Sequence, residues 1–104
     1  MHIAWVNERA DFVGGAERYV ARVAELLRAR GHRNTLLYSV SGWTEPRFTQ
    51  HFDGAFPLVD GERQLRELAP DVLFVHQLRG RTEVANLLRA RVPSVRFFHD
   101  HALF

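Results

Sequence analysis

The apolar run Val72–Val75 constrains the fold of this chain more than any other feature. It lies within Asp71–His76, between Pro70 and Gly80, and no polar residue interrupts it. A strand with one face in water alternates apolar and polar residues, whereas a continuous run suits a strand buried on both faces of a parallel sheet. The run therefore predicts a parallel sheet that is covered by helices on both sides.

Apolar runs alternate with helical patterns along the whole chain. The runs predict five strands, at Ile3–Asn7, Asn34–Val40, Phe56–Val59, Asp71–His76 and Val95–His99. Strands that alternate with helices form right-handed βαβ units in a parallel sheet. We expect an α/β fold with about five strands in the order 3-2-1-4-5 and with flanking helices.

Three helices are predicted between these strands from apolar residues at helical spacing. The first follows Gly14-Gly15, ends at Gly31 as the C′ residue, and has an inward face formed by Ala16, Val20, Val23, Ala24 and Leu27. Its other face carries Arg18, Arg22, Glu25 and Arg28. The chain thus offers one long amphipathic helix directly after its first strand.

Two shorter helices are predicted later in the chain. The first of them is capped by Asp60 and stops at Pro70, with an inward face formed by Leu65, Leu68 and Ala69. The second can be capped by Thr82, with Val84, Leu87 and Leu88 pointing inward.

The stretch Ser41–Gly54 contains Gly42 and Pro46 and is predicted to be a long loop. A loop of this length in a small domain is either functional or mobile. Its ring-bearing side chains could stack on a sugar or touch a lipid, as in peripheral membrane association, but such residues more often pack back onto the domain: Trp43, Phe48, His51 and Phe52.

Composition excludes several classes of function. The 104 residues include no cysteine, which rules out disulfides and thiolate metal sites. No segment reaches the roughly 18 apolar residues of a membrane span, so we expect a cytoplasmic chain. All 14 basic residues are arginine and are spread among acidic residues, giving a formal net charge of only +2. Nucleic-acid binding is therefore not favoured.

Gly14, Gly15, Ala16 and Glu17 form the first candidate binding segment, because they join a predicted strand to a predicted helix. Free backbone N–H groups and the positive end of the helix dipole would face an anionic ligand there. The same glycines could simply make the tight turn of an α/β unit. Neither a dinucleotide fingerprint nor a P-loop is present. Glu17 is assigned to the first helical turn or to a hydroxyl of the ligand.

Two histidines, His76 and His99, end the fourth and fifth predicted strands. The carboxyl ends of parallel strands share one edge of the sheet, and ligands bind there where the strand order reverses. We therefore group both histidines with the glycine segment. His99 and His101 would share one face of a strand, but two imidazoles do not make a zinc site, so no metal is predicted.

The chain resembles the N-terminal Rossmann-like domain of GT-B glycosyltransferases of the retaining family-4 type. The resemblance spans nearly the whole chain and rests on Gly14–Glu17, Arg30–His32, Pro70–His76 and Pro93–His101. It implies that Gly14 and Gly15 approach the phosphate of a nucleotide-sugar donor and that His99 acts beside the transferred sugar. Asp100 would support His99 or help to bind the acceptor.

The implied function is sugar transfer from a nucleotide-sugar donor to an acceptor hydroxyl, with no cofactor. Residues 1–104 would then be one partial, acceptor-side domain, since the C-terminal domain of that family and its Glu-x7-Glu pattern are missing. This piece alone is not expected to catalyse transfer, and its uncovered apolar surface predicts a homodimer. The alternative is a non-catalytic sugar- or nucleotide-binding, or self-assembling, α/β module.

Overall fold

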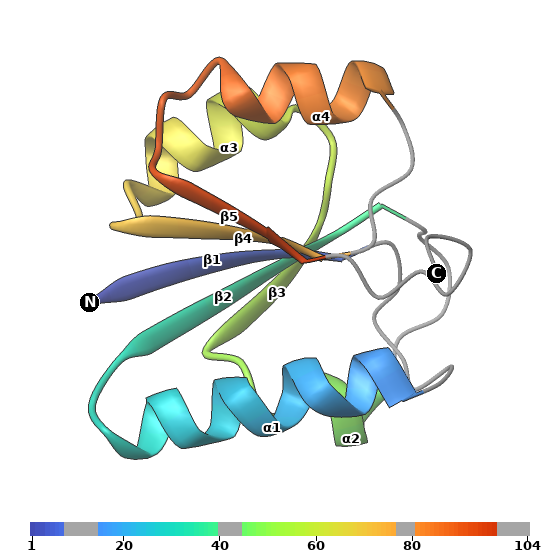
Figure 1. Ribbon diagram of the computed structural model, residues 1–104, viewed down its shortest axis with the longest axis vertical. Helices are drawn as coiled ribbons and strands as arrows, with labels where there is room; N and C mark the ends of the chain where they lie inside the picture. The colour runs from blue at the N-terminus through green and yellow to red at the C-terminus, as the bar shows by residue number, and fades with distance from the viewer. Residues whose placement is uncertain (8–14, 40–44, 77–80, 98–104) are drawn as a thin grey trace.

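The computed structural model describes residues 1–7, 15–39, 45–76 and 81–97, which form one sheet of five parallel strands (Figure 1). The strands are β1 (His2–Asn7), β2 (Arg33–Tyr38), β3 (Gly54–Pro57), β4 (Val72–His76) and β5 (Ser94–Phe97). Their order is β3-β2-β1-β4-β5, and every neighbouring pair is parallel. This confirms the predicted Rossmann-like α/β fold and its strand order.

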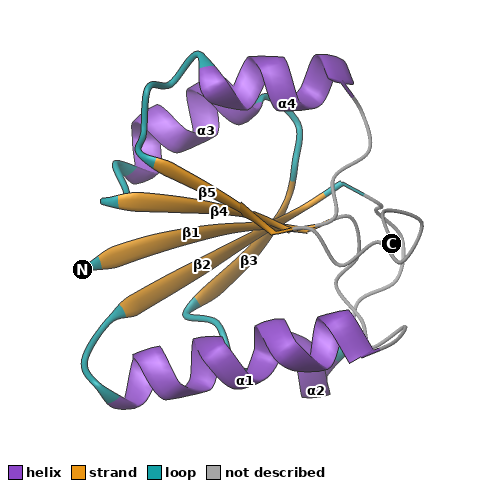
Figure 2. Ribbon diagram, in the orientation of Figure 1, coloured by secondary structure: helices purple, strands orange, loops and turns teal. Residues whose placement is uncertain are grey.

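Helices cover both faces of the sheet. They are α1 (Gly15–Ala29), α2 (Pro46–Thr49), α3 (Gly61–Leu68) and α4 (Arg81–Leu88). Figures 1 and 2 show α1 and α2 below the sheet and α3 and α4 above it. The steps from β1 to β2 and β3 run in one direction and the step from β4 to β5 in the other. Right-handed crossovers therefore place the two helix pairs on opposite faces.

Each face of the sheet has its own apolar core. The lower core joins the sheet to α1 and α2 through buried residues that include Trp5, Leu36, Val20, Phe48 and Phe52. The upper core joins it to α3 and α4 through Ala4, Val6, Leu37, Leu65, Leu73, Val75 and Leu87. Successive residues of a strand point to opposite faces, so β1, β2 and β4 contribute to both cores. The prediction that β4 is covered on both sides is confirmed.

The α1 helix follows the predicted pattern closely. Val20 and Ala24 are fully buried, and Arg18, Arg22, Glu25 and Arg28 are exposed. Gly31 has a φ of 89°, and the N–H of His32 donates to the Leu27 carbonyl oxygen at 3.0 Å. The helix therefore ends in a Schellman turn, whose left-handed residue favours glycine.

The predicted long loop contains more structure than its sequence suggested. Helix α2 lies within the range 41–54, and Phe48 and Phe52 are buried in the lower core. Strand β3 begins at Gly54, two residues before the predicted start, and ends at Pro57. Packing of the two aromatic rings explains why this region is more structured than predicted, because tertiary burial overrides weak local propensity.

The last two helices differ from their predictions in detail. Thr82 lies inside α4 and does not cap it, and Leu88, predicted to point inward, is 51% exposed. Ala69 is exposed, with a left-handed φ of 47° that ends α3, and does not line the buried face. Asp60 caps α3 and Leu65 is buried, as predicted. No helix among the described residues is long and apolar enough to cross a membrane.

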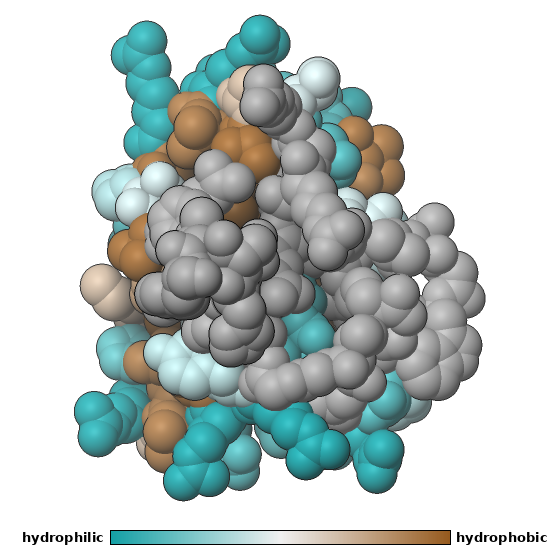
Figure 3. All heavy atoms as spheres, turned by 45° about the vertical axis from the view of Figure 1, so that its right-hand side comes forward, coloured by the Kyte–Doolittle hydropathy of each residue, from teal (hydrophilic) through white to brown (hydrophobic). Residues whose placement is uncertain are grey.

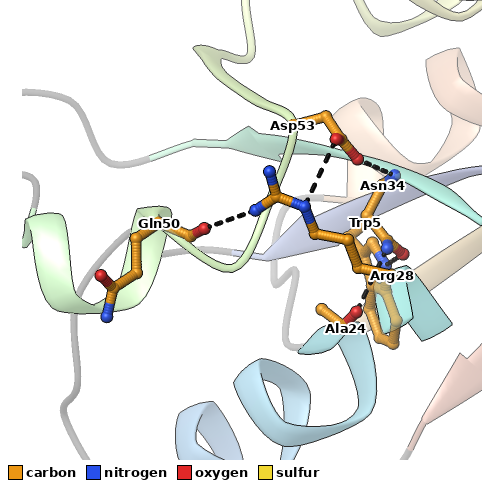
Figure 4. Close-up of polar contacts among 6 residues, drawn as sticks. All are labelled: Trp5, Ala24, Arg28, Asn34, Gln50 and Asp53. Atoms are coloured by element: carbon orange, nitrogen blue, oxygen red, sulfur yellow. Dashed lines mark hydrogen bonds and ion pairs between the residues drawn. The ribbon is translucent and has the colours of Figure 1, made fainter. Parts of the chain in front are cut away.

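A series of hydrogen bonds and an ion pair connects the lower helices to the sheet (Figure 4). The Nε1–H of buried Trp5 donates to Oδ1 of buried Asn34 at 2.8 Å, and Nδ2 of Asn34 donates to the Ala24 carbonyl oxygen at 3.3 Å. The Asn34 N–H donates to Asp53 at 2.7 Å, and Asp53 lies 3.6 Å from the Arg28 guanidinium. The sequence analysis did not identify this series of hydrogen bonds. The sequence feature that could have indicated it is a tryptophan and an asparagine within predicted strands.

Replacing Trp5 by Phe should destabilise the fold by about 2–3 kcal/mol. The change leaves Oδ1 of Asn34 without its hydrogen-bond donor in an apolar core and opens a cavity where the indole ring lies. Urea unfolding followed by circular dichroism measures this. The control Phe56→Leu trims an aromatic ring that is 49% exposed and should cost only about 0.5 kcal/mol. Equal stability of the two variants would contradict a structural role for the indole N–H.

Candidate functional site

Three adjacent strands end side by side at the carboxyl edge of the sheet. Asn7 of β1 is in register with Tyr38 of β2 and with His76 of β4. In open parallel sheets, ligands bind outside the carboxyl ends of the strands where the strand order reverses. Here the order reverses between β1 and β4. Asn7 and His76 therefore border the position at which a ligand is expected.

Asn7 belongs to the floor of this site. Its side chain is 1% exposed, and its carbonyl oxygen accepts a hydrogen bond from the Ser39 N–H at 3.2 Å. That bond continues the pairing of β1 with β2 one residue beyond Tyr38. Asn7 is thus held in place from the β2 side as well as by its neighbour β4.

The start of α1 lies at the same edge, because helices in βαβ units run back antiparallel to the strands. The first turn of α1 contains Glu17, which is 4% exposed. A carboxylate in the first helical turn is stabilised by the positive end of the helix dipole. Burial favours the first of the two predicted roles of Glu17, in the first turn of the helix, over contact with a hydroxyl.

The predicted site residues fall into two groups. Gly15, Ala16 and Glu17 begin α1 and His76 ends β4, so the structure brings these four to one edge. Gly14, His99, Asp100 and His101 lie outside the described residues. Their predicted contributions stay predictions. Within the described ranges, no group of three or more histidine, aspartate or glutamate side chains could hold a metal ion.

Two hollows on the described surface lie beside α3 and contain none of the predicted site residues. One, of about 430 Å³, is an open depression lined by Asp60, Glu62, Arg63, Arg66 and Glu67. Its charges are neutralised in pairs, since Arg63 lies 3.1 Å from Glu67 and Arg66 lies 2.7 Å from Glu62. The other, of about 270 Å³, is lined by Leu37, Phe56, Gln64, Glu67 and Leu68. Neither hollow combines depth with unpaired polar groups, so neither replaces the carboxyl edge as candidate site.

Asp60 joins the two upper helices. Its Oδ1 atom accepts hydrogen bonds from Nδ2 of Asn86 in α4 at 3.1 Å and from the Arg63 N–H of α3 at 3.3 Å. These hydrogen bonds, with that from Asn86 the larger effect, lower the pKa of the Asp60 carboxyl from its ordinary 3.8. The sequence analysis identified the cap but not the link to Asn86, which depends on how the two helices lie.

Comparison with known proteins shows a similarity of fold. No family model and no curated protein sequence matches this chain. The solved structure of a universal stress protein from Archaeoglobus fulgidus matches with a TM-score of 0.55, over 92% of this chain and 92% of that chain. The sequences are 16% identical, so the similarity shows a shared fold and nothing further.

The predicted resemblance to a GT-B glycosyltransferase is wrong. A solved structure that matches over 92% of this chain is a universal stress protein, and no family model matches. The features that carried the resemblance are needed by parallel α/β units in general. Gly31, for example, is explained by the left-handed turn that ends α1. Sugar transfer is withdrawn with it, while the domain bounds and the partners predicted from the sequence stay predictions.

Asp60 should contribute stability that disappears in acid. Its pKa is lowered in the folded state, so its contribution is present above the unfolded value and is lost as the pH falls through the folded value. The variant Asp60→Asn keeps a good helix cap but does not titrate. Thermal unfolding should show the wild type to be more stable than the variant at about pH 7. This difference in stability should disappear at about pH 2. A difference that stays constant over this range would contradict the assignment.

Proposed function

We propose that this chain is a non-catalytic α/β module that binds a phosphate-bearing small molecule of the nucleotide class at the carboxyl edge of its sheet. The reversal of strand order between β1 and β4 carries the proposal, because it defines the crevice in which such folds bind ligands. Asn7 and His76 are register partners at this point. The proposal corresponds to the non-catalytic alternative of the sequence analysis and does not include sugar transfer.

The chemistry of the edge supports a phosphate group. Helix α1 has 15 residues and begins at Gly15, so N–H groups that have no partner within the helix, and a full helix dipole, stand at its start. A glycine at this position lets an anion approach the backbone closely. The buried Glu17 carboxylate would help to hold this first turn, and the phosphate would contact the backbone.

The rest of the ligand would lie over the ends of β1 and β4. An imidazole group can donate and accept hydrogen bonds to a base or a ribose, and His76 ends β4 at this point. His99 and Asp100 follow β5 in the sequence, and their part in the site stays a prediction. The proposal agrees with the cytoplasmic location predicted from the sequence, which stays a prediction.

Titration of the isotope-labelled chain with ADP, adenosine and inorganic phosphate tests the proposal. ADP should shift the amide resonances of Gly15–Glu17, Asn7 and His76, with a dissociation constant on the order of 100 μM. Adenosine should bind at least about tenfold more weakly, because it lacks the phosphates that the helix start would hold.

Two histidine variants make the test specific to the edge. His76→Ala should weaken ADP binding about tenfold. His32→Ala is the matched control, since His32 lies at the opposite, amino edge, where its Nδ1 is 3.1 Å from the N-terminal amine. This control should bind ADP like the wild type. No shift with any of the three compounds at millimolar concentration, or shifts confined to the amino edge, would overturn the proposal.

A further inference from the structure

The upper face of the sheet carries a hollow at its outer strand β3. This β3 hollow, of about 270 Å³, lies between β3 and α3 and is lined by Leu37, Phe56, Gln64, Glu67 and Leu68. Phe56 is in register with Leu37 of the upper core, so its ring points to the upper face, but it is 49% exposed. The β3 hollow is therefore mainly apolar and open to solvent.

Gly54 sets the position of the Phe56 ring. The two residues are two apart in a strand, so they face the same side of the sheet. A Cβ atom added at Gly54 would lie 2.9 Å from Cε2 of Phe56 and 3.2 Å from its Cζ. The ring thus lies where the side chain of any other residue at position 54 would be. One apolar wall of the β3 hollow is held in this way.

Val59 protrudes beside the β3 hollow. It is 86% exposed, more than any other large apolar residue that the structure describes. Oε1 of Gln64, a lining residue, accepts hydrogen bonds from the N–H groups of Val59 at 2.9 Å and Asp60 at 3.2 Å. Nε2 of Gln64 donates to the Pro57 carbonyl oxygen at 2.9 Å. The backbone that presents Val59 is therefore fixed, which lowers the entropy lost when this side chain meets a partner.

The edge of β3 is poorly suited to pairing with a strand of another chain. The strand has only four residues, Gly54–Pro57, and its last residue has no backbone N–H. Short edge strands that contain proline resist the addition of a further strand. A partner at this edge would therefore contact the side chains of the β3 hollow and of Val59.

Charges of both signs border the β3 hollow along α3. Arg63 lies 3.1 Å from Glu67, which lines the hollow, and Arg66 lies 2.7 Å from Glu62. Surface pairs of this kind contribute little stability, so they can exchange partners at small cost. Figure 3 shows hydrophilic residues (teal) next to apolar ones (brown) in the upper part of the molecule, where α3 and α4 lie.

We propose that the β3 hollow and Val59 form the contact surface of a homodimer with two-fold symmetry. A two-fold interface uses the same patch on both copies, so the patch has to be complementary to itself. This patch contains both a protruding apolar side chain and an apolar hollow. Val59 of each copy would enter the β3 hollow of the other, and Arg63 of each copy would meet Glu67 of the other.

The mixed charges favour a second copy over an unrelated partner. A surface built for an acidic or a basic partner carries charges of one sign, whereas this one carries both. The patch is small beside the roughly 1,200–2,000 Å² that stable interfaces bury, so we expect a weak dimer with a dissociation constant on the order of 100 μM. The surface does not include Asn7, His76 or the start of α1, so it is independent of the proposed ligand site.

Sedimentation equilibrium at about 10 μM to 1 mM tests the dimer. Val59→Asp should weaken dimerisation at least about tenfold, because it would bring a charge into an apolar hollow. The matched control is Leu26→Asp, since Leu26 is 52% exposed on α1, below the sheet, and its change should leave the dimer intact. A wild type that stays monomeric at about 1 mM, or a dimer that Val59→Asp does not weaken, would overturn the proposal.

Charge reversal tests the contact between Arg63 and Glu67 of different copies. Arg63→Glu alone and Glu67→Arg alone each bring like charges together across the interface and should weaken dimerisation about fivefold at low salt. An equimolar mixture of the two variants should recover a mixed dimer, because both contacts between the copies then join opposite charges. Circular dichroism checks that each variant folds.

The mixture separates contacts between copies from contacts within one helix. Residues 63 and 67 of each variant still carry like charges within their own α3, so only pairing between the copies explains a recovery. A mixture that associates no more tightly than either variant alone would contradict the proposed arrangement.

Discussion

The lower half of the structure depends on the buried hydrogen bond between Trp5 and Asn34. Trp5 lies in the central strand β1, and Asn34 lies in β2 and also donates to the α1 backbone at Ala24. Through Asp53 the same asparagine holds the turn that leads into β3. A buried polar group costs free energy unless it is bonded, so these residues accept few alternative arrangements. The bond thereby sets the position of α1 on the sheet.

The position of α1 on the sheet has two consequences. At one end it places the helix start beside the carboxyl ends of β1 and β4, where the nucleotide-class ligand is proposed to bind. Along its side, the contacts of Glu25 and Arg28 turn one flank toward the β3 half of the sheet.

The wrong glycosyltransferase prediction shows that local sequence patterns indicate elements of the fold and not the function. A strand, a glycine turn and an amphipathic helix occur in any parallel α/β unit, because each crossover needs a turn at both ends. Gly31 and the run Val72–Val75 have complete structural explanations, a left-handed helix end and burial on two faces. Function in such folds depends on side chains at the strand ends, and fold similarity alone does not transfer it.

The sequence by itself determined the fold class, the strand order and the inward face of α1. Unbroken apolar runs are compatible with few environments, and right-handed crossovers leave few topologies. The tertiary structure alone decided that α2 forms, that Leu88 is exposed, and that Asn34 joins Trp5 to α1. These features depend on contacts between residues far apart in the chain, and periodicity within one segment carries no information about such contacts.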